Sequence, residues 1–496
     1  MTRFIRSALI AVSFLLAATA WSQTVIVTQA ADASTLDPGF NRELATYNVL
    51  WHIFDPLLIK QDDGTFTAGL AESWEAVSET TWHLTLREGA TFHNGEPVTA
   101  DAVAYSLARI LDEDNASPIR SGFAWMTGLE VLNELEFLVH SDAPQPLAEL
   151  IFSELLIVPP AHVDAAGNDA FGTNPVGSGP YRFVSWQRGV EIVLEANPDY
   201  WGEPAPAERL IFRPSEDAFS RTSSLSAGET DLIVGVPASL APLLAGSGSI
   251  DLRSVESARV IYIGINTLQG GALADPRVGQ ALNYAVDVDA IIAGVLAGDG
   301  VPTTTLLTEA DFGYTSGVER FPFDPERARE LLAEAGATDL SITVGTPNGR
   351  YVNDVQVAQA VAAQLQDVGI DANVEVTEYG AYVGALFSGN APDTYLIGWG
   401  NAPYDADYVF WNLTATDQLL SYYSDERLDE LVTLARSTVD RDVRAEAYAE
   451  AVQILTDAPA AIYLYKPIDS YGISAQLANW EPRGDELIRI HGFELR

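Results

Sequence analysis

Flat aromatic side chains gather in one short stretch of the sequence, together with a carboxylate and an amide. Trp399, Tyr404 and Trp411 offer apolar walls that suit a peptide, a sugar ring or a cation. Asn401 and Asp405 lie between them and supply hydrogen-bonding groups. The combination favours recognition of a small molecule, and we predict that these five residues contact a ligand.

The same residues also have structural interpretations that the sequence leaves open. Trp411 fits a position in the core, and Asp405 and Asp407 fit a solvated loop or a helix cap. Trp125 is a further candidate contact, because it lies in an aromatic segment bounded by serine and glycine.

No motif of a catalytic site is present. Gly177-Ser178-Gly179 lacks the spacing of a nucleophile elbow, and the sequence contains no H-E-x-x-H. The 69 acidic residues leave a glycosidase-type pair of carboxylates open by counting alone. We predict a protein without catalytic residues, with a periplasmic hydrolase as the alternative from another class.

Metal ligands are also missing from the pattern. The sequence has no cysteine, and its six histidines are scattered without a pair at helical spacing, which argues against zinc. Residues 112–115 are acidic enough for calcium but lack the full spacing of an EF-hand loop, so an acidic helix end is the preferred interpretation. We predict no metal site and no cofactor.

Charge excludes one class of partner. The formal net charge of −42 repels nucleic acid and anionic lipid headgroups, so we expect neither as a partner. The acidic residues are spread along the chain, which is typical of solubility in a salty exterior. Attraction of a cationic solute is the other interpretation.

The first 22 residues are typical of a secretory signal peptide. Arg3 and Arg6 precede an apolar run that is too short to span a bilayer, and small residues follow it up to Ser22. We expect cleavage after Ser22 or Ala20, and export to the periplasm. The absence of cysteine argues against a lipid anchor.

The elements that must position these residues alternate between strands and helices. One βαβ unit is expected from the strand at 209–213, the helix at 217–227 and the strand at 231–234. A second is expected over 341–377. Further strands are predicted at 82–86, 259–266, 394–399 and 461–465, and helices after Thr99, Asp275 and Asp324. The pattern predicts an α/β fold with two lobes and a ligand in the crevice between them.

Five ordered motifs then carry a resemblance to a known family. They are Leu70-Ala71-Glu72-Ser73-Trp74-Glu75 with residues 82–101, Asn174-Pro175-Val176-Gly177-Ser178-Gly179-Pro180-Tyr181, Asn197-Pro198-Asp199-Tyr200-Trp201-Gly202, residues 275–287, and residues 324–336. The chain resembles the extracellular solute-binding proteins of family 5, which serve ABC importers of peptides, opines and nickel. Most of these motifs have a scaffolding interpretation, since Gly177 and Gly179 suit a tight turn.

The resemblance implies a two-lobed periplasmic binding protein fold with an extra inserted domain, of the type II, cluster C-like class. Domain I is expected from residues 24–47, 176–266 and 468–496, domain II from 48–175, and domain III from 267–467. The ligand is expected between domains I and III, which close on a hinge.

Function and partners follow from the resemblance as expectations. A monomer would bind an oligopeptide-like solute and deliver it to a permease and ATPase complex. An opine, an oligosaccharide, glutathione or a nickel chelate are alternatives, and so is a peptide-holding chaperone. Relatives carry an aspartate for the ligand's amino group soon after the tryptophan, where this chain has Asn401 or Ala402, so this anchor is missing or its role is shifted to Asp405. They also contact ligands near Phe40 and Asn41, where a surface turn is the alternative.

Overall fold

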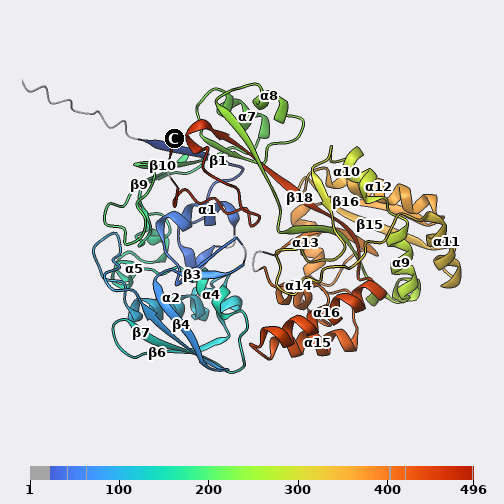
Figure 1. Ribbon diagram of the computed structural model, residues 1–496, viewed down its shortest axis with the longest axis horizontal. Helices are drawn as coiled ribbons and strands as arrows, with labels where there is room; N and C mark the ends of the chain where they lie inside the picture. Colours follow the sequence, from blue (N-terminus) through green and yellow to red (C-terminus); the bar gives the residue numbers. More distant parts are fainter. Residues whose placement is uncertain (1–22, 42, 63, 402–403, 419, 494) are drawn as a thin grey trace, which may run out of the picture.

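A mixed sheet of twelve strands runs through both halves of the molecule, and two smaller sheets lie beside it. Figure 1 shows two lobes joined by long strands. The signal peptide predicted over residues 1–22 lies outside the described part of the chain. The computed structural model describes residues 23–41, 43–62, 64–401, 404–418, 420–493 and 495–496.

One end of the large sheet forms the first lobe, in which β1 lies between the parallel strands β10 and β11. Helix α7 (Ala218–Ser226) connects β10 to β11, and Asp217 caps it by accepting from the Ser220 amide. The predicted βαβ unit therefore forms, with β1 inserted between its strands. The strands are β1 (Thr24–Gln29), β8 (Tyr181–Gln187), β9 (Glu191–Ala196), β10 (Arg209–Pro214), β11 (Leu232–Val234) and β12 (Ile250–Glu256).

A four-stranded antiparallel sheet packs beside the first lobe, in the order β4-β5-β7-β6. Helix α2 (Ala100–Leu111) begins where predicted, because the Thr99 hydroxyl accepts from the Ala102 amide. The strands of this sheet are β4 (Ala71–Ser78), β5 (Thr81–Leu86), β6 (Met126–Val131) and β7 (Glu136–Ser141). Helix α4 (Ala148–Glu154) and the two-stranded pair of β2 (Leu58–Lys60) and β3 (Phe66–Ala68) lie beside them.

The other end of the large sheet forms the second lobe, where β15, α12 and β16 make the second predicted βαβ unit. Its strands are β13 (Arg259–Ile265), β14 (Gly300–Pro302), β15 (Ser341–Asn348), β16 (Asp371–Glu378) and β17 (Thr394–Gly400). Its helices are α9 (Pro276–Tyr284), α10 (Val288–Gly294), α11 (Pro325–Glu334), α12 (Asp354–Asp367), α13 (Tyr379–Phe387), α14 (Ala406–Leu413), α15 (Glu426–Arg436) and α16 (Arg441–Asp457).

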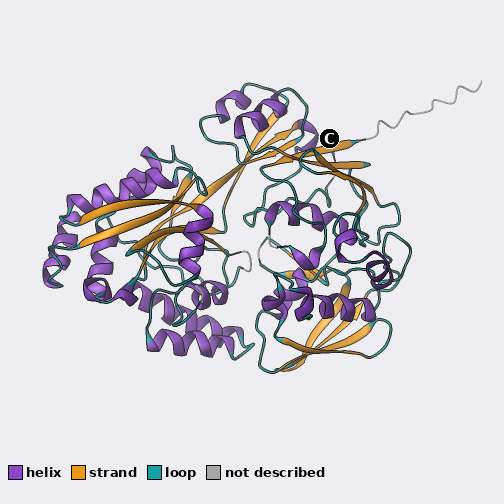
Figure 2. Cartoon of the chain, turned by 180° about the vertical axis from the view of Figure 1, so that it is seen from behind, coloured by secondary structure: helices purple, strands orange, loops and turns teal. Residues whose placement is uncertain are grey.

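Strand β18 (Ala461–Ser474) belongs to both lobes. Its first residues pair with β13, and its last residues pair with β11 and β12. The sequence predicted only the part from 461 to 465, so the strand is longer than expected. Figure 2 shows it from behind, crossing from one lobe to the other.

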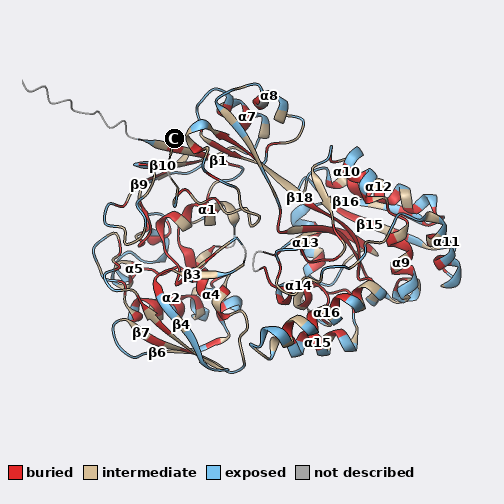
Figure 3. Cartoon of the chain, in the orientation of Figure 1, coloured by how far each residue is buried: buried red, intermediate tan, exposed pale blue. Residues whose placement is uncertain are grey.

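Separate apolar cores fill the two lobes. Two clusters flank the sheet of the second lobe, a third lies in the first lobe, and a fourth lies under the four-stranded sheet. A small fifth cluster, around Leu225 and Leu244, also lies in the first lobe, and each of the five clusters of described residues takes its side chains from one lobe. Figure 3 shows buried residues on the strands and helices of both lobes. Because burial of one large apolar side chain stabilises by roughly 1.5–3 kcal/mol, each lobe has its own source of stability.

Gly177 and Gly179 are needed for close packing and not for the tight turn that the sequence suggested. Neither has a positive φ. A Cβ at Gly177 would lie 2.0 Å from the carbonyl oxygen of Ile53, and one at Gly179 would lie 2.7 Å from that of His52. The motif brings two backbone segments together where side chains cannot fit.

Short helices complete the fold. They are α1 (Leu44–Ile53), α3 (Arg120–Phe123), α5 (Pro160–Ala166), α6 (Asn168–Phe171) and α8 (Ala241–Ala245), with 3₁₀ turns at Pro38–Phe40, Glu113–Asn115, Thr267–Gln269, Gly271–Ala274 and Ala475–Leu477. None of the helices in the described part of the chain is long and apolar enough to cross a membrane.

Candidate ligand-binding cavity between the lobes

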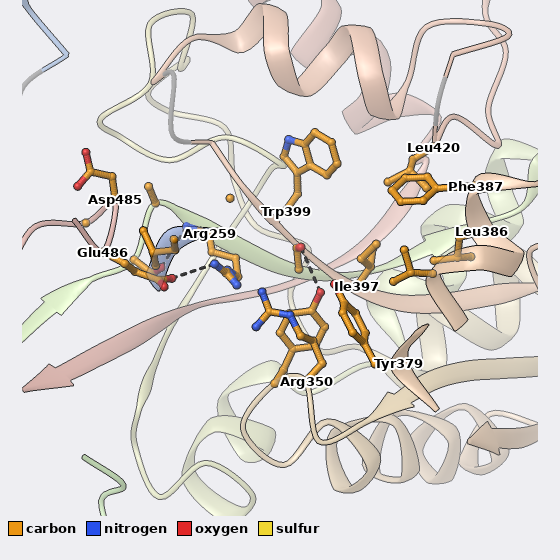
Figure 4. A pocket seen from close by; sticks show the side chains of 18 residues that line it. Arg259, Arg350, Tyr379, Leu386, Phe387, Ile397, Trp399, Leu420, Asp485 and Glu486 are labelled. Carbon is orange, nitrogen blue, oxygen red and sulfur yellow. Dashed lines mark hydrogen bonds and ion pairs between the residues drawn. The ribbon is translucent and has the colours of Figure 1, made fainter. Parts of the chain in front are cut away.

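A cavity of about 330 Å³ lies where the lobes meet. One wall comes from the second lobe and the other from α1 and a segment near the C-terminus (Figure 4). This size is in the range of small-ligand pockets. The lining residues are Leu44, Ser257, Ala258, Arg259, Arg350, Tyr351, Tyr379, Val383, Leu386, Phe387, Ile397, Gly398, Trp399, Gly400, Leu420, Gly484, Asp485 and Glu486.

Aromatic rings form much of the wall on the second lobe. Trp399 lies near the end of β17, with its ring 5.1 Å from that of Tyr408. The Tyr351 hydroxyl donates to the Gly398 carbonyl at 3.2 Å, which fixes this ring against the same strand. These faces suit apolar side chains or flat groups of a ligand.

Arg350 presents a guanidinium group to the cavity. Its Cζ lies 5.1 Å from the centre of the Tyr351 ring and 5.6 Å from that of Tyr379. Among the described residues, no carboxylate lies within ion-pair distance of it. A planar cation held between rings can bind a carboxylate in two-point fashion.

Two acidic residues of the C-terminal segment, Asp485 and Glu486, also line the cavity. Asp485 is paired with Lys60 at 3.1 Å and with Arg483 at 2.7 Å. Burial opposes its ionisation, but the hydrogen bonds and charges of these two cations outweigh burial and hold the pKa of Asp485 well below its usual range. The cavity therefore contains groups of both charges.

Of the residues predicted from the sequence, only Trp399 lines this cavity. Asn401 is buried, and its Nδ2 donates to the carbonyl of Asp405 at 3.1 Å. Tyr404 adopts a φ of +55° and lies against Lys60, with 4.7 Å between the Lys60 nitrogen and the ring centre. It lines two neighbouring cavities of about 380 and 310 Å³.

Asp405 has the contacts of a helix cap. Its side chain accepts from the Asp407 amide at the start of α14 and pairs with Arg444 at 2.7 Å. Burial raises the pKa of Asp405, with the Arg444 charge acting in the opposite direction. Trp411 packs under Arg436, whose Cζ lies 3.8 Å from the ring centre. Both side chains are thus engaged within the second lobe.

The remaining candidates lie away from the cavity lining. Phe40 contacts Arg109, whose Cζ is 5.3 Å from the ring centre. Asn41 is buried and accepts from the Glu43 amide at 2.8 Å, in the manner of an Asx turn. Trp125 packs on Phe152 beneath the four-stranded sheet. The structure therefore does not bring these three residues to Trp399.

Sequence reasoning missed most of the charged lining. Arg350 and Tyr351 follow β15 after a single glycine, so the rule that places ligands at the carboxyl ends of strands could have found them. Asp485 and Glu486 lie in an irregular segment near the C-terminus. Because this segment has no helical or strand periodicity, its sequence does not indicate which side chains point into the cavity.

Metal ligands do not converge in the described part of the chain, where no group of three or more histidine, aspartate or glutamate side chains could hold an ion. The acidic stretch after α2 forms a 3₁₀ turn, Glu113–Asn115, in which Asp112 accepts from the Asp114 amide. This is the helix-end arrangement preferred from the sequence.

Comparison of the chain with known proteins identifies its family. The profile described as bacterial extracellular solute-binding proteins, family 5 Middle, matches residues 65–419. The chain belongs to this family. It acts as the substrate-binding protein of an ABC importer, as the resemblance implied.

Relatives match along nearly the whole solute-binding protein. The dipeptide-binding protein of Escherichia coli is 30% identical, with 87% of this chain and 88% of that protein covered. Among solved structures, HbpA2 from Haemophilus parasuis aligns with a TM-score of 0.86 at 23% identity, covering 95% of this chain and 100% of that one. DppA from Helicobacter pylori, in complex with the peptide STSA, aligns with a TM-score of 0.77 at 22% identity, covering 92% and 95%. The predicted two-lobed binding-protein fold is confirmed.

Proposed function

We propose that the protein captures short peptides in the cavity between the lobes and delivers them to the permease and ATPase of the importer. The observation that carries this proposal is the guanidinium of Arg350, which lines the cavity without a carboxylate partner among the described residues. A peptide supplies a terminal carboxylate for it, whereas a neutral sugar does not.

Similarity supports the same ligand class. The relative with 30% identity is a dipeptide-binding protein. The volume of about 330 Å³ suits a ligand of two or three residues better than a long oligopeptide. The aromatic wall around Trp399 would then contact a side chain of the peptide.

The proposal includes a division into domains and a motion. Domain I comprises residues 24–47, 176–266 and 468–496, domain II residues 48–175, and domain III residues 267–467. The lobes would close on the strands that connect them, near Ser257 and Pro467. A ligand favours the closed form only through contacts that the open form lacks.

Location and assembly complete the proposal. The protein would work in the periplasm as a monomer, without catalysis, after removal of residues 1–22. Association with the permease would depend on the closed form, because only that form presents both lobes in one fixed arrangement.

Calorimetry with a panel of ligands tests the function. Purified protein is titrated with dipeptides and tripeptides, glutathione, an opine, a trisaccharide and a nickel–histidine chelate. We expect binding of the peptides only, and a Trp399→Ala variant should bind them about tenfold more weakly. Exclusive binding of the sugar or the chelate would overturn the peptide proposal, and unchanged affinity of Trp399→Ala would remove this wall from the site.

A further inference from the structure

The ring of Tyr404 is buried without belonging to the apolar core of either lobe. The residue is 6% exposed, yet it is absent from the five core clusters of the described residues. It belongs to the second lobe by its place in the chain, between β17 and α14. Its burial therefore depends on contacts other than the packing of that core.

Three residues on the side of the first lobe surround this ring. The Lys60 nitrogen, at the end of β2, lies 4.7 Å from the ring centre. A Cβ added to Gly64 would lie 3.5 Å from the Tyr404 Cβ, and one added to Gly484 would lie 3.1 Å from its hydroxyl oxygen. Strand β3, which follows Gly64, and helix α14, which follows Tyr404, lie in different lobes (Figure 1). Lys60, Gly64 and Gly484 thus form a socket for a tyrosine of the other lobe.

Each side of this contact is held in place by its own lobe. Tyr404 has a φ of +55°, a left-handed value that is uncommon for residues other than glycine. Its amide donates to the Asn401 carbonyl at 3.0 Å, and its carbonyl accepts from the Phe312 amide at 2.8 Å. On the opposite side, Lys60 is paired with Asp485 at 3.1 Å, and its side chain is 7% exposed. A strained residue fixed in this way is a candidate for a functional contact.

Cavities lie on both sides of the ring. Tyr404 lines one of about 380 Å³ and one of about 310 Å³, and each takes further lining residues from both lobes. Phe66 and Phe312 line the larger cavity, and Asp62 and Thr308 line the smaller. The lobes therefore meet here at a localised contact with space beside it, and one side chain carries much of that contact.

We propose that Tyr404 is a latch, a side chain of the second lobe that docks in the socket of the first lobe and holds the ligand-free protein closed. The proposal rests on the lobe closure in the proposed function and not on the class of ligand. Opening would expose the ring and remove its contact with Lys60, whereas the contacts of Tyr404 with its own lobe would remain. Tyr404 then acts on binding through the equilibrium between open and closed lobes, in place of the direct ligand contact predicted from the sequence.

Pulsed EPR on the ligand-free protein tests the latch, because the chain has no cysteine and accepts two introduced spin labels. Asp142→Cys and Ser437→Cys place the labels at exposed positions after β7 and α15, at the ends of the two lobes away from α7 and α8 (Figure 1). Label distances are measured in this background with no further change and with Tyr404→Ala, Tyr404→Phe, Lys60→Met or Phe323→Ala. Phe323 is the aromatic control on the second lobe, since it is 50% exposed and lies outside the socket.

We expect Tyr404→Ala to lower the ratio of closed to open protein at least about tenfold, because it removes the buried ring together with the cation contact. Tyr404→Phe and Phe323→Ala should keep the short label distance. Lys60→Met tests the contact from the first lobe without altering a strained residue, and it should lower the ratio about threefold.

The latch is overturned if Tyr404→Ala, or Lys60→Met where Tyr404→Ala does not fold, keeps the label distances of the unchanged background. It is also overturned if Phe323→Ala lengthens them equally. Because the measurement contains no ligand, its failure leaves the peptide proposal standing, and a failure of peptide binding in the calorimetry leaves the latch standing.

Discussion

Asp311 is a buried carboxyl that supports the aromatic loop. Its side chain accepts from the Thr308 amide at 2.6 Å, while Oδ1 has no partner and the residue is 4% exposed. The neighbouring Phe312 donates to the Tyr404 carbonyl and accepts from the Ala406 amide, each at 2.8 Å. Asp311 therefore lies next to the backbone hydrogen bonds that hold the segment after Trp399.

Burial raises the pKa of Asp311 to about 7. The folded protein then binds a proton that the unfolded chain, with a carboxyl pKa near ~3.9, has released, so stability falls as pH rises from ~4 to 7. Asp311→Asn removes this dependence of stability on pH. The difference in melting temperature between the variant and wild type should therefore shift in favour of the variant as the pH rises from ~4 to 7. The effect should be of the order of 1–4 kcal/mol by thermal or urea denaturation.

The same substitution at Asp367, which is exposed on α12, serves as the control for charge removal. A constant difference between Asp311→Asn and wild type at pH 4.5 and pH 7.5 would show that Asp311 is ionised throughout.

Single residues differ in how far the sequence reveals them. Trp399 could be predicted because it ends a strand that faces the crevice. For Asp405, the sequence could not distinguish a helix cap from a ligand contact, since an aspartate side chain serves both roles. Glu486 carries no sequence signal, because its position depends on a left-handed residue inside an irregular segment.

At the scale of elements, glycine has two uses in this fold: it allows close backbone contact at Gly177 and a left-handed turn at Gly189. Gly177→Ala would force a Cβ against the Ile53 carbonyl, and we expect a loss of about 3 kcal/mol or more in unfolding free energy. Gly189 has open space around it but a φ of +71°, so Gly189→Ala should cost only about 1–2 kcal/mol. Denaturant unfolding of both variants measures the difference. Equal losses would mean that the backbone contact at Gly177 relaxes without cost.

Most elements follow from local signals, with β18 as an instructive exception. The helices after Thr99, Asp275 and Asp324 begin at these residues because each side chain accepts from an amide of the first turn. The pattern for β18 breaks at Pro467, since proline suggests the end of a strand. The strand continues because the Pro467 carbonyl accepts from the Ser257 amide.

At the scale of the molecule, two βαβ units predicted two lobes, but the sequence could not show that both share a sheet. Pairing between β13 and β18 joins residues about 200 positions apart, a distance over which periodicity carries no information. The boundaries of the three domains remain a prediction for the same reason.

Charge also acts on the whole molecule. The formal net charge of −42 makes the folded state repel itself, and salt screens this repulsion. We expect the melting temperature to rise by a few degrees between 10 mM and 500 mM sodium chloride, measured by calorimetry. Potassium chloride should act equally, because screening does not depend on the cation. A melting temperature that falls with salt would indicate that attractive ion pairs outweigh the repulsion.

The strand shared by the lobes also constrains how the chain is made. β11 and β13 both pair with β18, which is synthesised more than 190 residues after them. Leu232 pairs with Ile473, and Ile263 pairs with Ile462. The part of the large sheet in either lobe cannot be completed until β18 has left the ribosome. Until then, we expect the nascent chain to stay incompletely folded. Export through a narrow channel requires a chain in this state.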